Sequence, residues 1–172
     1  LFFELELNRI DDAALAEKLK SKALAHYKPW IDNLLMEKPY QLDDKLEELF
    51  LEKSQTGFSA FNRLFDETMS SLRFEVDGET LALEPTLNLM QHKDEAKRKA
   101  GALALAKTFT ENLRLFTLIT NTLAKDKDIS DRWRGFKDIA DARHLSNRVE
   151  PEVVAALVEA ARAAYPKLSH RY

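Results

Sequence analysis

Cysteine is absent from all 172 residues of the chain. This absence excludes disulfide bonds, cysteine-ligated zinc and thiol nucleophiles, and it is compatible with the cytoplasmic location that we expect. The four glycines are isolated, so the chain has no glycine-rich loop that could cradle a phosphate. No apolar run approaches the roughly 18 residues that a membrane span needs. We therefore expect a protein with no membrane partner.

The charge balance is close to neutral, and the formal net charge is −3. A protein with a pervasive basic face for nucleic acid would be positively charged, so we expect no nucleic-acid partner. Hydrophobic residues make up 45% and charged residues 32% of the chain, as in ordinary globular proteins. The length suits one domain with a sizeable core. We therefore predict a single domain over residues 1–172.

Hydrophobic periodicity predicts a mainly α fold, a multi-helix bundle or array. One small β-hairpin interrupts it at about residues 73–83, where Asp77-Gly78 separates alternating apolar residues and favours a type I′ turn. Two lone strands are marginally stable, so this hairpin should lie against helices. Glu150-Pro151 opens a further helix, whose apolar residues Val153, Leu157 and Val158 are expected to face inward.

The longest predicted helix covers most of residues 92–128. Between Asp94 and Asp126 there is no proline, and Gly101 is the one glycine. Apolar residues recur at helical spacing. In the second half of the helix, the apolar face widens until it covers most of the circumference. Such a helix is normally enclosed by neighbours, so we expect a buried helix of about 50 Å.

Candidate catalytic or metal-binding groups are scarce. The four histidines, at positions 26, 92, 144 and 170, form no His-x-x-x-His pair, so no zinc-binding helix is predicted. No Gly-x-Ser-x-Gly elbow is present. Glu47-Glu48 is interpreted as a solvated face rather than a general-acid pair. The sequence therefore predicts no catalytic residue, no metal ligand and no cofactor in this chain.

Residues 131–148 have an unusual mixture of arginine, tryptophan and aspartate. One interpretation is a rim that binds anionic groups, such as a peptide carboxylate, or an interface with another domain. The other is a solvated helix end whose arginines pair locally with aspartates and whose Trp133 packs inward. A polar loop ahead of a capped helix is a common place for functional residues. The candidate substrate or interdomain contacts are Trp133, Arg134, Arg143, His144, Asn147 and Arg148.

Four ordered segments resemble one peptidase family. Residues 52–67 resemble the run EKS-x-TG-x-x-A-x-x-RLFDE of oligoendopeptidase F, a group of zinc metallopeptidases related to thimet oligopeptidase. Residues 121–127 are similar to its N-x-L-x-KDK segment, and residues 143–154 to R-x-L-x-N-x-V-x-PEVV. The Tyr-Pro and His-Arg-Tyr near the end match the run that precedes the catalytic half of that family.

The resemblance implies a helical N-terminal region that forms one wall of a substrate cleft. The family's zinc site is a His-Glu-x-x-His helix with a downstream glutamate, and none of these residues is present here. The implied cofactor, zinc, and the short peptide substrates therefore belong to a parent enzyme. The implied partner is a C-terminal catalytic domain, and this chain alone should be inactive.

The ends of the sequence agree with that expectation. The chain starts without methionine, at Leu1-Phe2-Phe3, and stops soon after a Tyr-Pro step, so we expect a piece of a longer protein. Loss of a partner domain would leave an apolar surface that could cause self-association. The alternative hypothesis is a stand-alone helical module that recruits another protein through residues 133–148.

Overall fold

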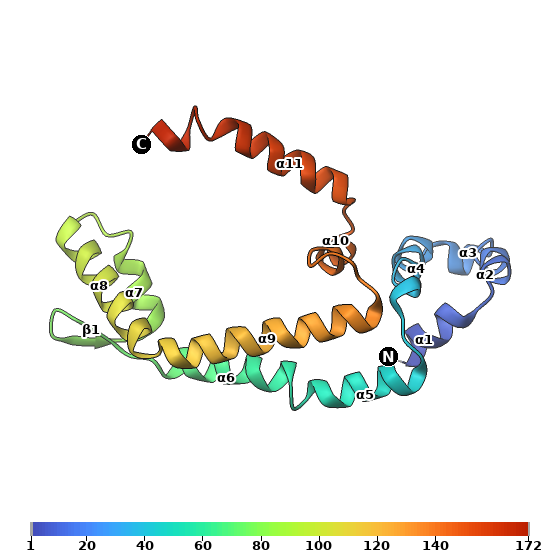
Figure 1. The fold of residues 1–172 in the computed structure, drawn as a ribbon, viewed down its shortest axis with the longest axis horizontal. Helices are drawn as coiled ribbons and strands as arrows, with labels where there is room; N and C mark the ends of the chain where they lie inside the picture. Colours follow the sequence, from blue (N-terminus) through green and yellow to red (C-terminus); the bar gives the residue numbers. More distant parts are fainter. Residues whose placement is uncertain (1, 172) are drawn as a thin grey trace. The chain divides into compact units, whose positions relative to one another are not determined.

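The computed structural model describes residues 2–171, which form an array of helices with one β-hairpin (Figure 1). This confirms the predicted fold class. The helices are α1 Phe2–Arg9, α2 Asp12–Lys18, α3 Lys22–Ala25, α4 Lys28–Leu35, α5 Asp44–Ser54, α6 Phe58–Ser71, α7 Leu83–Leu89, α8 Glu95–Glu111, α9 Leu113–Arg134, α10 Asp141–Asn147 and α11 Pro151–Ala164, with 3-10 turns at Lys38–Tyr40 and Ser169–Arg171. The strands are β1 Phe74–Val76 and β2 Glu79–Leu81.

The chain divides into two compact units by its internal contacts. Unit 1 comprises Leu1–Glu47 and Ile129–Tyr172, and unit 2 comprises Glu48–Asp128. Each unit has its own cluster of buried hydrophobic side chains. The assignment of residues 1–172 to one domain stays a prediction.

The hydrophobic cluster of unit 1 joins the first helices of the chain. Leu7 of α1, Leu15 of α2, and Ile31 and Leu34 of α4 form its buried centre. The Asp11 carboxylate accepts a hydrogen bond of 3.0 Å from the Ala14 N–H and so caps α2, because the first N–H groups of a helix have no partner within it. These short helices therefore owe their position to a shared core.

The hydrophobic cluster of unit 2 forms where the hairpin packs on helix α8. Phe74 is fully buried, and its ring meets that of Phe109 edge to face with 5.7 Å between centroids. β1 and β2 pair antiparallel, with Phe74 opposite Leu81. Asp77 and Gly78 have φ angles of 52° and 88°, as a type I′ turn requires. The predicted hairpin, its turn and its packing against helices are confirmed.

The predicted long helix over residues 92–128 is wrong in two respects. It consists of two helices, α8 and α9, with Asn112 between them, and Figure 1 shows that the two helices run in different directions. The Asn112 side chain donates a hydrogen bond of 2.9 Å to the Thr108 carbonyl, and its own carbonyl accepts from the N–H groups of Leu115 and Phe116. Asparagine competes with helix hydrogen bonds in this way, so the chain turns without proline or glycine.

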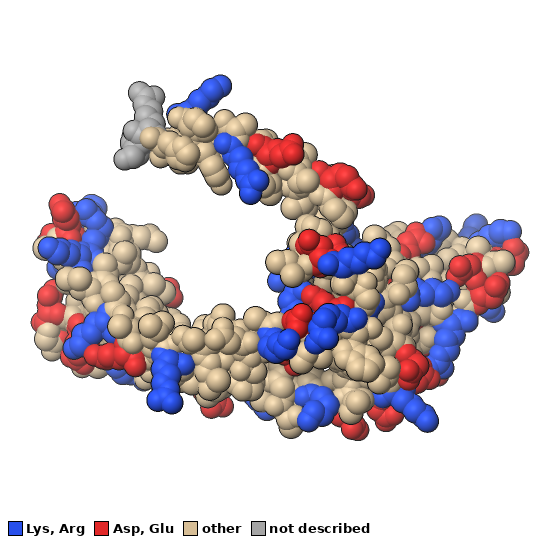
Figure 2. All heavy atoms as spheres, viewed as in Figure 1, with Lys and Arg blue, Asp and Glu red and all other residues tan. Residues whose placement is uncertain are grey.

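The second error concerns burial. Ile119 is the buried residue of α9, whereas Leu118 is 55% exposed and Leu113 of the same helix is also exposed. Over the first half of α9, Figure 2 shows uncharged side chains at the surface. This part of the helix is therefore not enclosed by the described residues of unit 2.

Helix α11 begins at Pro151 as predicted, but its apolar face does not point inward. Leu157 is 70% exposed, Val153 and Val158 are also exposed, and α11 contains no buried residue. The spacing of the residues identified an amphipathic helix correctly, but amphipathicity does not specify which surface covers the apolar face. Among the described residues, no helix is long and apolar enough to cross a membrane.

Candidate functional site

A buried ion pair holds the turn between α4 and α5 against the end of α9 in unit 1. Glu47 is only 6% exposed, and its two oxygens accept hydrogen bonds of 2.7 and 2.9 Å from the Arg134 guanidinium. Arg134 also donates to the Tyr40 carbonyl at 3.1 Å. The Leu42 N–H donates to Glu47 at 2.9 Å. Bidentate geometry and additional donors are the conditions under which a buried pair is well compensated.

The pair shifts both ionisation equilibria toward the charged forms. The hydrogen bond from Arg134 lowers the pKa of the Glu47 carboxyl, and it outweighs the opposing effect of burial. The Leu42 N–H and the positive charge of Arg134 act in the same direction. The hydrogen bond to Glu47 raises the pKa of Arg134. Both groups are therefore charged at neutral pH, and the pair is a fixed structural element rather than a proton donor or acceptor.

Aromatic packing continues from this ion pair. Gly135 follows the last residue of α9 and has a φ angle of 82°, a left-handed conformation that suits glycine after a helix. The next residue, Phe136, returns toward the turn, where its ring stacks on Tyr40 with 4.1 Å between centroids and 16° between planes. The helix end therefore places Arg134 and Phe136 beside the same turn.

These side chains border a cavity of about 330 Å³, which we call the acidic cavity. The wall includes three glutamates, one arginine, two amides and two aromatic rings. Its lining residues are Glu4, Leu5, Asn8, Glu37, Tyr40, Gln41, Glu47, Arg134, Phe136, Ala142, Leu145 and Ser146. The volume lies at the lower end of the range for small-molecule sites.

A second cavity of about 300 Å³ lies beside α10 and shares Tyr40 and Leu145 with the first. We call it the His144 cavity; Asp141, His144 and Arg148 are among its lining residues. The Asp141 carboxylate accepts from the N–H groups of Asp138 and Lys137 at 2.8 and 3.1 Å. These bonds, that of Asp138 foremost, lower the pKa of Asp141.

Arg148 ends α10 in an uncommon backbone conformation. Its φ angle is 53°, in the left-handed region, which is disfavoured for residues other than glycine, asparagine and aspartate. Its side chain donates to Glu37 at 2.7 Å and to the Leu145 carbonyl at 3.1 Å. Glu37 lines the acidic cavity and Arg148 lines the His144 cavity, so this ion pair lies on the border of both.

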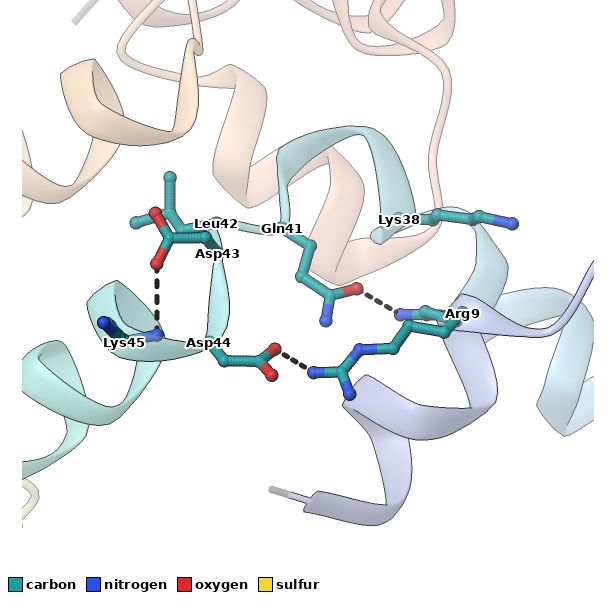
Figure 3. Close-up of a pocket in the computed structure, with 8 residues that line it drawn as sticks. Arg9, Lys38, Gln41, Leu42, Asp43, Asp44 and Lys45 are labelled. Atoms are coloured by element: carbon teal, nitrogen blue, oxygen red, sulfur yellow. Dashed lines mark hydrogen bonds and ion pairs between the residues drawn. The ribbon is translucent and has the colours of Figure 1, made fainter.

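A shallower depression of about 530 Å³ lies on another side of Asn8 and Gln41. Figure 3 shows Arg9 and Asp44 pointing toward each other, and they form an ion pair. Asp43 accepts from the Lys45 N–H at 3.1 Å (Figure 3) and so helps to cap α5. Arg9 and Asp44 are thus engaged with each other and Asp43 with the start of α5, which favours a structural role for the depression.

The predicted contact residues divide into two groups. Arg134 lines the acidic cavity, and His144 and Arg148 line the His144 cavity. Arg143 and Asn147 are exposed and line neither cavity, and neither does Trp133, which is 56% exposed. Trp133 does not pack inward. Arg134 and Arg148 pair with glutamates 87 and 111 positions away in the sequence.

Sequence reasoning missed Glu47, Asn8 and Tyr40. Glu47 was interpreted as part of a solvated face, and the structure shows that this interpretation was wrong, because its carboxylate is buried against Arg134. No local pattern could have linked the two residues. Within residues 2–171, no three histidine, aspartate or glutamate side chains gather in an arrangement that could hold a metal ion.

Comparison with known proteins agrees with the peptidase resemblance. Residues 6–74 match the family model described as oligopeptidase F. The fold is similar to a solved structure assigned as a peptidase from Chlamydophila abortus, with a TM-score of 0.77 and 14% sequence identity. The match covers 98% of this chain and 29% of that one. No curated protein sequence matches this chain. The resemblance to the N-terminal region of oligoendopeptidase F is thereby confirmed over residues 6–74.

Proposed function

We propose that this chain is the N-terminal helical region of a zinc-dependent oligoendopeptidase that hydrolyses short peptides in the cytoplasm. In this proposal it forms one wall of the substrate cleft. The observation that carries it is the match of residues 6–74 to the oligopeptidase F family model. The similarity of the fold to 29% of a longer peptidase chain supports it.

The described residues do not fit a zinc site, since no suitable cluster of ligands is present among them. The zinc ion and the catalytic groups would then belong to a C-terminal catalytic domain of the parent protein. A zinc ion in that domain would polarise the scissile carbonyl and activate water. The chain described here would bind and orient peptides and exclude folded proteins.

Within that role, we assign the contacts with peptide or with the catalytic domain to residues 133–148. Arg134, His144 and Arg148 border the two cavities of unit 1. Trp133, Arg143 and Asn147 are exposed, which suits contacts with a second surface. Removal of that second surface should make the backbone amide hydrogens of these residues exchange faster with solvent. We expect faster hydrogen exchange at residues 141–149 in the 172-residue chain than in the parent, and equal rates would contradict this assignment.

The decisive experiment compares the parent protein with this chain. The reading frame should encode His-Glu-x-x-His within a few hundred residues after Tyr172. The parent should cleave a quenched fluorescent peptide, lose activity with a chelator and regain it with zinc. The 172-residue chain should bind no stoichiometric zinc and cleave nothing. Zinc binding with peptidase activity in this chain alone, or a frame without that motif, would refute the proposal.

A second candidate, a helical module that recruits another protein, draws support from the exposed apolar faces of α9 and α11. Exposed apolar surface often marks an interface. The two candidates differ in a simple property. A free-standing recruitment module would be expressed without a catalytic domain, whereas a peptidase region would not.

A further inference from the structure

Helix α11 carries its charged and its large apolar side chains on opposite sides. Successive residues of an α-helix are rotated by about 100°, so Glu152, Glu159 and Arg162 fall within an arc of about 80°. The large apolar side chains fall within an arc of about 140°, centred nearly opposite. These side chains, which we call the apolar arc, are Val153, Val154, Leu157 and Val158. Such a division is typical of a helix that packs one face against protein and keeps the other in water.

The described residues of this chain leave the apolar arc uncovered. Leu157 is 70%, Val153 55% and Val158 43% exposed, and Val154 is only half-buried. Tyr165 follows α11 with a backbone that is still helical, which places it on the side of the arc, and it is 46% exposed. A contiguous apolar surface of this kind marks an interface more often than a surface left in water.

The size of the apolar arc limits what can cover it. Helix α11 has 14 residues, so it is about 21 Å long and about 10 Å wide, and half of its lateral surface amounts to about 300 Å². A stable interface between two molecules buries about 800 Å² on each side. Two copies that met through α11 alone would together bury about 600 Å², as crystal contacts do. The arc is therefore too small to hold a second copy of the chain.

The occupant that fits this area is covalently joined to α11. A segment of the same polypeptide loses little translational freedom when it docks, so a small area suffices. Contacts between domains of one chain bury about 600–1,500 Å², and the apolar arc reaches the lower end of that range. The similar peptidase chain is matched over only 29% of its length. A chain with this fold thus occurs joined to a larger remainder, which can supply the covering surface.

We propose that the apolar arc of α11 docks on an apolar surface of the catalytic domain of the parent protein. The arc is then the buried side of the helix, while Glu152, Glu159 and Arg162 stay in water on the other side. Helix α11 thus adds an apolar attachment to the contacts assigned to residues 133–148. This inference rests on the proposed function, because it takes the catalytic domain as the occupant.

The absence of cysteine from this chain allows a test with single thiol probes. Leu157→Cys places a small, apolar thiol in the apolar arc, and the matched control Glu152→Cys places one among the charged side chains. The rate of reaction with dithionitrobenzoate is measured for each variant in the parent protein and in the 172-residue chain, and the reactivity of the unsubstituted protein is subtracted. Comparison of the two rates at one position removes the intrinsic reactivity of that thiol.

The two positions should respond differently to the presence of the catalytic domain. Leu157→Cys should react at least about 100-fold more slowly in the parent than in the 172-residue chain, because a docked thiol reacts only when the interface opens locally. Glu152→Cys should react at rates within about twofold of each other in the two proteins, since its thiol needs no opening. In the 172-residue chain, the rate of Leu157→Cys should not depend on protein concentration.

Three outcomes would overturn the proposal. Equal rates of Leu157→Cys in the parent and in the 172-residue chain would mean that the apolar arc stays in water. Equal slowing of Leu157→Cys and Glu152→Cys would indicate general shielding rather than docking of one face. Slowing that grows with protein concentration, in either protein, would identify a second copy as the occupant. A parent that protects Leu157→Cys but cleaves no peptide would refute the proposed function and still support docking of α11 on the rest of its chain.

Discussion

The buried pair of Glu47 and Arg134 offers the sharpest test of the packing in unit 1. Glu47→Gln keeps the size of the side chain and removes its charge. The new amide also offers a donor toward Arg134, where the carboxylate offered acceptors. The variant leaves the guanidinium beside the Tyr40 carbonyl but without its bidentate partner. The substitution should therefore destabilise unit 1 without altering its core.

The structure sets the expected magnitude. Removal of one partner from a fully buried pair costs about 3–5 kcal/mol, because the other charge remains buried. The Arg134 side chain is 26% exposed, so water can partly solvate its charge, and we place the cost at about 3 kcal/mol. Such a loss is large compared with the total stability of about 5–15 kcal/mol that is common for domains.

The distribution of aromatic residues supplies a selective assay. The two tryptophans, Trp30 and Trp133, both lie in unit 1, so tryptophan fluorescence reports on this unit. In urea, a loss of 3 kcal/mol with an m value of about 2 kcal/mol/M lowers the midpoint by about 1.5 M. The matched control is Glu48→Gln, the exposed neighbour on α5, which should shift the midpoint little.

The stability that the ion pair contributes should also depend on pH, and the direction of this dependence follows from the pKa of Glu47. The pKa of Glu47 is lowered in the folded protein, so the pair contributes fully above the ordinary pKa of a glutamate. This contribution is lost as the pH falls through the lower, folded pKa. The stability difference between the wild type and Glu47→Gln should be constant from neutral pH to about pH 5 and shrink below it.

A double-variant cycle completes the test. Arg134→Met and the double variant Glu47→Gln with Arg134→Met should reveal a coupling free energy of about 2 kcal/mol, since the residues share one network. A loss below about 0.5 kcal/mol for Glu47→Gln, or one equal to that of Glu48→Gln, would refute the reasoning. Either result would mean that solvent compensates the charges of both groups.

Three further predictions concern other parts of the chain. Gly101→Ala should destabilise unit 2 by about 1–3 kcal/mol in far-UV circular dichroism, because the new Cβ would lie 2.9 Å from Leu89 Cβ; a stabilised variant would contradict this packing. Arg148→Gly should be more stable than Arg148→Ala by about 1 kcal/mol in urea unfolding followed by fluorescence, since both lose the Glu37 pair and only glycine relieves the positive φ; equal stabilities would contradict it. Leu157→Asn should change the stability of this chain by less than about 0.5 kcal/mol, because Leu157 is exposed, and a larger loss in thermal unfolding would show that α11 is covered.

Local sequence predicted those features that depend on neighbouring residues. Asp77-Gly78 specified the type I′ turn, because only a few residue types adopt two successive positive φ angles readily. Glu150-Pro151 marked the start of α11, since proline constrains the backbone where it stands. Of the four segments of the family resemblance, residues 52–67 lie within the range 6–74 that matches the oligopeptidase F family model; the other three stay predictions.

Local sequence was misleading where a local hydrogen bond competed with the periodic pattern. At Asn112 the apolar spacing continued across the break, so the pattern indicated one helix. The side-chain bond to Thr108 and the new turn that starts at the Asn112 carbonyl divide it. The propensity of one asparagine is too small to predict such a break, and its neighbours decide the outcome.

Taken alone, the sequence determined the helical class, the hairpin, the start of α11 and the family resemblance. These properties follow from backbone constraints and from periodic patterns within a few turns of chain. The tertiary structure alone decided which apolar faces are covered and which polar groups meet. Glu47 and Arg134, 87 residues apart, and Asn8 and Gln41, 33 apart, acquire their roles through folding. Whether a residue is buried or paired depends on residues that are distant in the sequence, and a local sequence pattern does not specify them.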